Sequence, residues 1–333
     1  CIRNDRSKII RLKPVLICAQ PCNLYYAWQI EVMLTNFREL ELYKYFEIQC
    51  VFSYHSEGAK FKEHMAMMQK VQNKFANEAT FHYYHDIREN TGYISSIRPN
   101  VLKQHFKYLP MLSQCVVFYH DCDIIFSKFP DFIFKYIGND SKWYVSDTKS
   151  YISSEYIKSK GNDIFQNMCE IVGIHPAMVS ARDEEAGGAQ YIMKGVDWMF
   201  WEKVEKDCSR LFNEITPIGV ARKIQKPSYH ELQIWCADMW AVLWNAWMRG
   251  YTTEIIPEME FTWTSHEMSK FDDRYIFHNA GVTEHDKERM FYKNQYTDKL
   301  PYFASDEMLD KTRASYKYFQ LLKRTGEESC LIN

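Results

Sequence analysis

Residues 115–126 read Cys-Val-Val-Phe-Tyr-His-Asp-Cys-Asp-Ile-Ile-Phe, an apolar run that ends in two aspartates and resumes directly after them. A continuous run of this kind, rich in β-branched and aromatic residues, is typical of a strand buried on both faces. The pattern predicts a strand that ends at Tyr119 and a second strand over 124–126. The acidic turn between them carries Asp121 and Asp123.

Strands and helices alternate on the N-terminal side of this run. Short apolar runs predict strands over 15–19, 46–54 and 80–84, and apolar positions at helical spacing predict helices over 24–40, 59–78 and 99–108. Such alternation favours an α/β fold with a mainly parallel sheet covered by helices on both faces. Ligands in such folds gather at the carboxyl ends of the strands, where the acidic turn is expected.

The C-terminal side is less regular. Its patterns predict strands over 143–147, 189–193, 252–256, 261–264 and 275–277, and helices over 162–172, 196–213, 229–249 and 305–325, with a connector over 216–227. No linker-like stretch divides the chain, so we expect one large domain over 1–333 with two halves that meet near residue 150.

Composition narrows the function classes. The 333 residues include 41 Lys+Arg and 43 Asp+Glu, so no basic excess favours a nucleic-acid partner or an anionic membrane surface. No apolar run approaches the roughly 20 residues that a membrane span needs. The aromatic fraction of 16% suits a protein that handles sugars, although a Tyr-rich core explains it equally well. Because the chain opens at Cys1 without a Met, we expect the native N-terminus upstream.

Asp121 and Asp123 are the first candidates for chemistry. Two carboxylates one residue apart at a strand end can share a hard divalent cation and leave positions open for phosphate oxygens. An Asp-x-Asp triplet also arises about once by chance in such a chain, so two solvated turn aspartates are the alternative. His278 follows the strand over 275–277 and could complete the metal site, or it could be a hydrogen-bonded core residue.

Further candidates lie on helices and on a glycine-rich strand. Arg98 and Lys103 flank a short helix and could meet a diphosphate, with a solvated helix face as the alternative for Lys103. Glu231 and Asp238 lie seven positions apart, on one face of the helix expected over 229–249, and could act on the reacting groups. Residues that could contact a sugar or acceptor are Gly187, Gly188, Gln190, Trp235 and Trp240, the tryptophans being core residues in the alternative reading.

The chain combines four features: a first strand that ends in Ala19-Gln20, an alternating α/β half, a strand that ends in Asp121-Cys122-Asp123, and a late strand with His278. Together they resemble the GT-A class of nucleotide-sugar-dependent glycosyltransferases over most of the chain. The resemblance implies that Asp121, Asp123 and His278 hold Mn²⁺ or Mg²⁺ against the donor diphosphate. It also implies that the end of the first strand cradles the base.

The expected function is therefore metal-dependent transfer of a hexose or pentose from a UDP-sugar to a hydroxyl of a glycan or protein. Residues 12–150 are the expected donor half and 151–300 the acceptor half. The residues assigned to donor binding are Ala19, Gln20, Tyr25, Arg98, Lys103, Asp121, Cys122 and Asp123, and those assigned to catalysis are Asp238 and Glu231. A non-catalytic carbohydrate-binding protein and a metal-dependent phosphohydrolase remain the alternatives.

A narrower similarity concerns the run Tyr-Tyr-Ala-Trp-Gln over 25–29, the Gly187-Gly188 strand with the Phe-Trp pair at 200–201, and the Ala237-Asp238 helix. These features look like the plant hydroxyproline O-arabinosyltransferases and peptidyl-serine α-galactosyltransferases. The connector over 216–227 departs from that pattern, so acceptor and stereochemistry do not transfer. The resemblance implies the lumen of the Golgi or endoplasmic reticulum, while the residues themselves also allow the cytoplasm.

Overall fold

The computed structural model describes residues 12–136 and 141–331. Within them, a seven-stranded sheet has the order β3-β2-β1-β4-β7-β6-β8, in which only β7 runs antiparallel to its neighbours. The strands are β1 (Val15–Pro21), β2 (Glu47–Tyr54), β3 (Thr80–His85), β4 (Val117–Tyr119), β6 (Lys142–Asp147), β7 (Gly187–Met193) and β8 (Thr252–Ile255). The α/β fold with a mainly parallel sheet, expected from the sequence, is confirmed.

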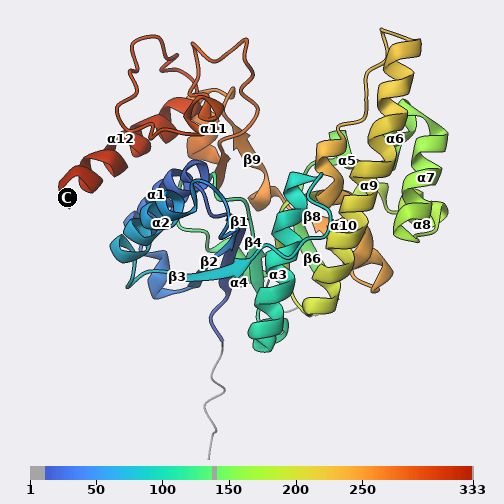
Figure 1. Ribbon diagram of the computed structural model, residues 1–333, viewed down its shortest axis with the longest axis horizontal. Helices are drawn as coiled ribbons and strands as arrows, with labels where there is room; N and C mark the ends of the chain where they lie inside the picture. Colours follow the sequence, from blue (N-terminus) through green and yellow to red (C-terminus); the bar gives the residue numbers. More distant parts are fainter. Residues whose placement is uncertain (1–11, 137–140, 332–333) are drawn as a thin grey trace, which may run out of the picture.

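Helices cover both faces of this sheet (Figure 1). One face carries α1 (Leu24–Glu39) and α2 (Phe61–Lys74), and the other carries α3 (Ile97–Tyr108), α9 (Trp198–Gln225) and α10 (Ala237–Met248). In β1, Leu16 packs into the core under α1, whereas Ile17 packs into the core under α3. Because successive side chains of a strand point to opposite faces, burial on both sides explains the uninterrupted apolar run.

The shorter helices complete the layers. Outside α9 and α10 lie α6, α7 and α8, while α4 and α5 follow strands and α11 connects two strands of a second, smaller sheet. Their bounds are α4 (Phe132–Lys135), α5 (Lys149–Ile152), α6 (Ser154–Lys160), α7 (Asn162–Val172), α8 (Pro176–Ala181), α11 (Met268–Asp273) and α12 (Ser315–Leu331). None of the helices in the described ranges combines the length and the apolar character that a membrane span requires.

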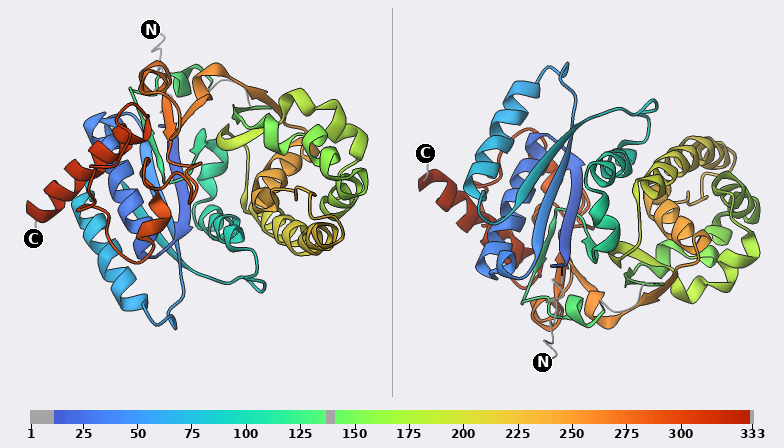
Figure 2. Two further views of the ribbon diagram at one scale, coloured as in Figure 1. Left: turned by 90° about the horizontal axis from the view of Figure 1, so that it is seen from above. Right: turned by 90° about the horizontal axis from the view of Figure 1, so that it is seen from below.

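A second, three-stranded sheet has the order β5-β10-β9, formed by β5 (Ile124–Phe126), β10 (Ile276–His278) and β9 (Phe261–Trp263). A third core, which includes Trp28 and Tyr318, joins α1 to this sheet and to α12, and α12 lies beside α1 in Figure 2. Since β5 pairs with β10, segments from before and after residue 150 share this small sheet. Both expected halves therefore contribute strands to the same sheets.

The connector expected over 216–227 is wrong for most of its length, because α9 continues to Gln225 and contains Pro217. Proline removes one helical hydrogen bond and usually ends a helix. Here the buried positions Leu211, Ile215 and Gly219 continue the packed face of the helix across the proline. Packing of that face outweighs the local preference of Pro217.

The helix expected over 229–249 begins only at Ala237, after a 3₁₀ turn at Ile234–Cys236. In the segment before this turn, the Tyr229 hydroxyl donates to the Lys160 carbonyl at 3.0 Å. Glu231 therefore does not share a helix with Asp238, and the expectation that the two carboxylates lie on one helix face is wrong.

The C-terminal helix expected over 305–325 begins ten residues later than predicted, at Ser315. The preceding segment forms turns because its backbone bonds to distant segments: Asp310 N–H donates to Arg289 O, and Met268 N–H donates to Thr312 O, both at 2.8 Å. Tertiary hydrogen bonds replace the local helical ones there.

Candidate functional site

The acidic turn directly follows β4, an interior strand of the large sheet, and lies at the side of the sheet where the parallel strands end. β5 follows the turn, and its antiparallel pairing with β10 sets Ile124 opposite His278. The backbone N–H of Asn279 also donates to the Asp123 carbonyl at 2.9 Å. This pairing sets His278 beside the acidic turn, although the two are more than 150 residues apart in the sequence.

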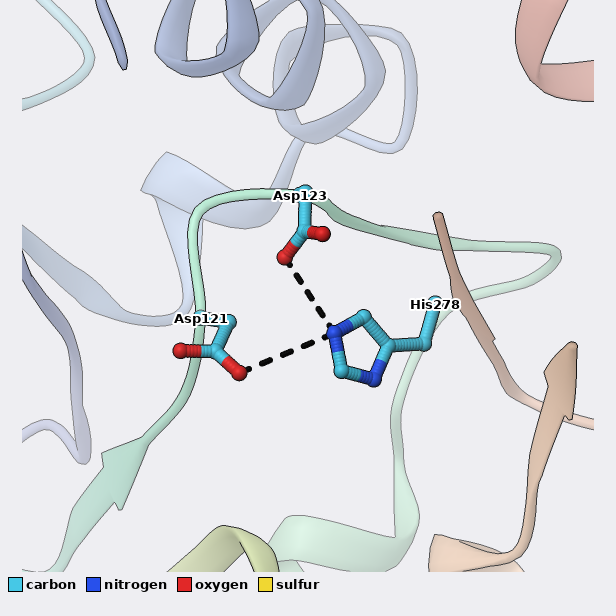
Figure 3. Close-up of side chains that lie close together, drawn as sticks. All are labelled: Asp121, Asp123 and His278. Carbon is cyan, nitrogen blue, oxygen red and sulfur yellow. Dashed lines mark ion pairs between the residues drawn. The ribbon is translucent and has the colours of Figure 1, made fainter. Parts of the chain in front are cut away.

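The three side chains point toward one another, as Figure 3 shows. His278 Nε2 lies 3.3 Å from Asp123 Oδ1 and 3.6 Å from Asp121 Oδ2. One ligand atom from each residue falls within 4.8 Å of the others, and no second group of three such residues occurs in the described part of the chain. The arrangement presents two oxygens and one nitrogen to a common point.

The remaining carboxylate oxygens face cations. Arg98 Nη1 donates to Asp121 Oδ1, and Lys293 Nζ donates to Asp123 Oδ2. Burial favours the neutral form of Asp123, but the positive charge of Lys293 and the contact with His278 outweigh it and lower the pKa of that carboxyl. Asp123 is therefore ionised, and both carboxylates are oriented by their cations before any ligand arrives.

The donor set fits a hard divalent cation. Carboxylate oxygens with one imidazole nitrogen suit Mn²⁺ and Mg²⁺, and such ions keep further positions for water and phosphate oxygens. The oxygens that meet at His278 are those not engaged by Arg98 and Lys293. Asp121, Asp123 and His278 are thus the residues that could hold a divalent cation.

Asp238 lies on the other side of Arg98. Its Oδ2 accepts from Arg98 Nη2 at 2.6 Å, and its Oδ1 accepts from the Tyr93 hydroxyl at 2.7 Å. Asp238 is 7% exposed. A buried carboxylate requires such partners, and Arg98 in turn joins Asp238 to Asp121.

A cavity of about 700 Å³ opens over these groups. That volume lies within the range of small-ligand and cofactor sites, about 300–1,000 Å³. Among the residues singled out from the sequence, those that line it are Gln20, Tyr25, Arg98, Asp121, Cys122, Asp123, Trp235, Asp238 and His278. The structure therefore places these nine residues, which include the expected metal ligands, around one cavity.

The structure does not bring the other predicted residues to the cavity. The described residues that line it do not include Ala19, Lys103, Gly187, Gly188, Gln190, Glu231 or Trp240. Trp240 is a core residue, fully buried, whose Nε1–H donates to the Ile152 carbonyl at 2.8 Å. Glu231 is exposed beside α9, and the Ala19 side chain is buried in the core.

The remaining four positions have structural contacts of their own. Lys103 pairs with Glu205 of α9 at 2.7 Å instead of meeting a ligand. Gln190 is buried and accepts from Ser146 at 2.6 Å. At Gly187, a Cβ atom would lie 2.4 Å from a methyl of Val145, so this glycine permits close contact between β7 and β6. Gly188 lies against the side chains of Tyr191 and Met239, which line the cavity.

Sequence reasoning missed several lining residues, among them Lys293, Tyr151, Tyr191 and Trp263. Lys293 lies in the irregular segment after β10, where no periodic pattern marks it. Tyr191 follows the two glycines within the same strand, and the close backbone approach that they indicate was the available signal. Tyr151 and Trp263 are two among many aromatic residues of the chain.

No family model matches the chain, and no curated protein matches it. Solved structures that match the chain include glycosyltransferases. The bifunctional glycosyltransferase WbbM has a TM-score of 0.46 at 9% identity, over 83% of this chain and 47% of that one. The chain thus spans about half the length of WbbM.

Two further structures are similar at low identity. The galactosyltransferase LgtC in complex with donor and acceptor sugar analogues has a TM-score of 0.43 at 11% identity, over 93% of this chain and 95% of that one. A mannosyltransferase from Pyrobaculum calidifontis, in complex with GDP-Man and Mn²⁺, has a TM-score of 0.29 at 11% identity, over 71% and 72%. Because these TM-scores lie below 0.5, the function has to be inferred from the site residues themselves.

Proposed function

We propose that the protein is a metal-dependent glycosyltransferase that transfers a sugar from a UDP-sugar to a hydroxyl of a glycan or protein. The observation that carries this proposal is the meeting of Asp121, Asp123 and His278 at one point of a large cavity, with Arg98 and Lys293 directly beside them. A nucleoside diphosphate needs both a divalent cation and basic side chains to offset its charge. The cavity provides residues for both.

Asp121, Asp123 and His278 would hold Mn²⁺ or Mg²⁺, which offsets the negative charge that develops on the departing diphosphate. Arg98 and Lys293 would bind phosphate oxygens on the same side, since their nitrogens already lie against the two carboxylates. Gln20 and Tyr25, at the end of β1 and in α1, would contact the nucleoside part. The Tyr25 hydroxyl is held by Asn294 at 2.9 Å.

The acceptor would enter beside Trp235, which is 59% exposed and lines the cavity. Its ring lies nearly parallel to that of Tyr151, with centroids 6.5 Å apart, and such apolar faces suit a sugar ring. In the reaction, the bond between the anomeric carbon and the diphosphate breaks. The acceptor oxygen forms the new bond to that carbon, and its proton passes to the departing diphosphate.

Asp238 has both oxygens engaged, by Tyr93 and Arg98. This arrangement favours electrostatic support of the reacting groups over proton abstraction, because a proton on Asp238 would remove the negative charge that is paired with Arg98. Asp238 would therefore act by holding Arg98 against the donor.

A thermal-shift panel tests the proposal. UDP and UDP-sugars, each with and without Mn²⁺, should raise the melting temperature only when metal and nucleotide are both present. A ligand at about 100 times its dissociation constant adds about 2.7 kcal/mol to stability. Asp123→Asn should abolish the shift, whereas Asp272→Asn, an exposed aspartate of α11, should retain it.

Two other outcomes would point elsewhere. Phosphate release from simple esters without a sugar acceptor would favour a phosphohydrolase. Binding of free glycan that does not depend on nucleotide, together with no nucleotide shift, would favour a carbohydrate-binding protein. A metal-independent nucleotide shift that persists in Asp123→Asn would contradict the metal assignment.

A further inference from the structure

Tyr191 of β7 is a residue of the cavity lining that carries a buried, unpaired hydroxyl. The residue is 2% exposed and lines the cavity, and its hydroxyl has no hydrogen-bond partner within the described residues. Its ring stacks on Tyr119 of β4, with centroids 5.9 Å apart and an interplanar angle of 18°, so the side chain is held in place. Buried hydroxyls in native proteins are nearly always paired, and an exception indicates a missing ligand or water.

An irregularity in β7 builds this position. Tyr191 pairs with Val145 of β6, but the next pair joins Ser146 to Gly188, so two residues of β7 have no partner on β6. Ala189, within this bulge, has a φ of 67°, which is rare for a residue with a side chain, and it lines the cavity. Bulges and strained residues of this kind occur next to binding sites, where they redirect side chains.

Gly188 makes room for the Tyr191 hydroxyl. A Cβ atom at Gly188 would lie 2.6 Å from the Tyr191 hydroxyl oxygen, closer than two such atoms approach. Only glycine therefore allows the hydroxyl to take this position. This contact explains the second glycine of the pair that the sequence singled out.

The hydroxyl remains protonated and lies near charged groups of the site. Burial raises the pKa of Tyr191, and the negative charge of Asp238 raises it further. A protonated hydroxyl can both donate and accept one hydrogen bond with a ligand hydroxyl. Asp238 is bonded to Tyr93 and Arg98, whereas the Tyr191 hydroxyl has no partner for its donor or its acceptor within the described residues.

We infer that the Tyr191 hydroxyl, held at the Gly188–Ala189 bulge, hydrogen-bonds a hydroxyl of the sugar part of the donor. The inference rests on the proposed function, because it places a diphosphate at Asp121 and Asp123. Arg98 pairs with both Asp121 and Asp238. The sugar attached to the diphosphate would lie beside Arg98, on the side of Asp238 and Tyr191. Tyr191 would then select among donor sugars by a single hydroxyl.

Calorimetric binding with Mn²⁺ and no acceptor tests this role. UDP, UDP-glucose, UDP-galactose, UDP-xylose and UDP-arabinose are titrated into the wild type and into Tyr191→Phe. We expect Tyr191→Phe to weaken the preferred UDP-sugar about three- to tenfold, the effect of one hydrogen bond, and to leave the affinity for UDP unchanged. One deoxy analogue of that sugar should lose the same factor in the wild type and nothing more in Tyr191→Phe.

Two further variants separate binding from folding. Gly188→Ala should weaken the same UDP-sugar and not UDP, because its methyl group would displace the hydroxyl. Tyr318→Phe, which removes a buried hydroxyl of α12 that is not part of the cavity lining, should change neither affinity. Tyr191→Phe should melt no lower than the wild type, since the hydroxyl it removes has no partner to lose.

The outcomes distinguish the two proposals. If the wild type binds UDP and a UDP-sugar with metal but Tyr191→Phe binds both equally well, the Tyr191 role is overturned and the proposed function stands. Equal weakening of UDP and of every UDP-sugar in Tyr191→Phe also overturns it. If the wild type binds no nucleotide with metal, the proposed function fails and the sugar subsite fails with it.

Discussion

Arg98 Nη2 lies 2.6 Å from Asp238 Oδ2, an ion pair that ties α3 to α10 across one wall of the cavity. The other terminal nitrogen of Arg98 reaches Asp121. One planar guanidinium therefore links a metal ligand to the residue proposed to support the reacting groups. Lysine, a single point charge, cannot hold both carboxylates in this way.

This linkage predicts strongly non-additive kinetics. Arg98→Lys and Asp238→Asn should each lower the rate of UDP release from the preferred UDP-sugar by about 100-fold, because each removes the same electrostatic support. The double variant should be scarcely slower than either single one, as a double-mutant cycle would measure. Lys103→Met is the matched control on the same helix, because Lys103 pairs with Glu205 outside the cavity. Fully additive losses would contradict the linkage.

The two tryptophans proposed from the sequence as sugar contacts should behave differently. Trp240→Ala should cost about 3–5 kcal/mol of unfolding free energy, because Trp240 is fully buried in the core. Trp235→Ala should change stability by less than about 0.5 kcal/mol, since most of its side chain is exposed. Urea denaturation measures both. Retention of Trp235→Ala on immobilised glycans should fall relative to the wild type, and unchanged retention would remove Trp235 from the acceptor site.

His105 should make the protein lose stability in mild acid. Burial lowers the pKa of His105 to about 3, and the neutral ring accepts from the Tyr84 hydroxyl at 2.8 Å and donates to Gln49 at 2.7 Å. The unfolded chain takes up the proton near pH 6.5. The contribution of neutral His105 to the free energy of unfolding is complete above pH 6.5. It declines as pH falls toward about 3, by roughly 3 kcal/mol at pH 4.

Urea denaturation at pH 7 and pH 4 tests this dependence. His105→Gln should lose markedly less stability between the two pH values than the wild type. His285→Gln, at an exposed position, is the control and should show the wild-type difference. Equal losses in the wild type and His105→Gln would contradict the role of His105.

Glu31 and Lys74 should anchor the C-terminal helix. Their side chains are 3% and 6% exposed, with 3.0 Å between Lys74 Nζ and Glu31 Oε1, and Lys74 Nζ also lies 3.0 Å from Ser329 Oγ of α12. Glu31→Gln removes the buried counter-charge of Lys74 and leaves only the half-exposed Glu328 carboxylate, 3.4 Å away, so it should cost about 3 kcal/mol. Urea denaturation measures the loss. Glu41→Gln, which removes the exposed partner of Lys44, should leave the urea midpoint unchanged.

Much of the fold was predictable where local pattern and burial agree. The run over 15–19 alternates between two buried faces, and it forms β1 as expected. The prediction failed where distant contacts override local preference, as at Pro217 within α9 and in the segment before Ser315. There the packed face of α9 and the bonds to Arg289 and Met268 carry free energy that no local window contains.

By itself, the sequence determined the strand that ends at Tyr119, the acidic turn after it and its place at a sheet edge, because strand period and burial are local properties. It also singled out His278 as a residue at a strand end. Only the tertiary structure decided that β10 pairs with β5, which sets His278 against Asp121 and Asp123. It likewise decided the contacts of Lys293 with Asp123 and of Arg98 with Asp238, because these depend on backbone pairing and packing between segments about 140 residues or more apart.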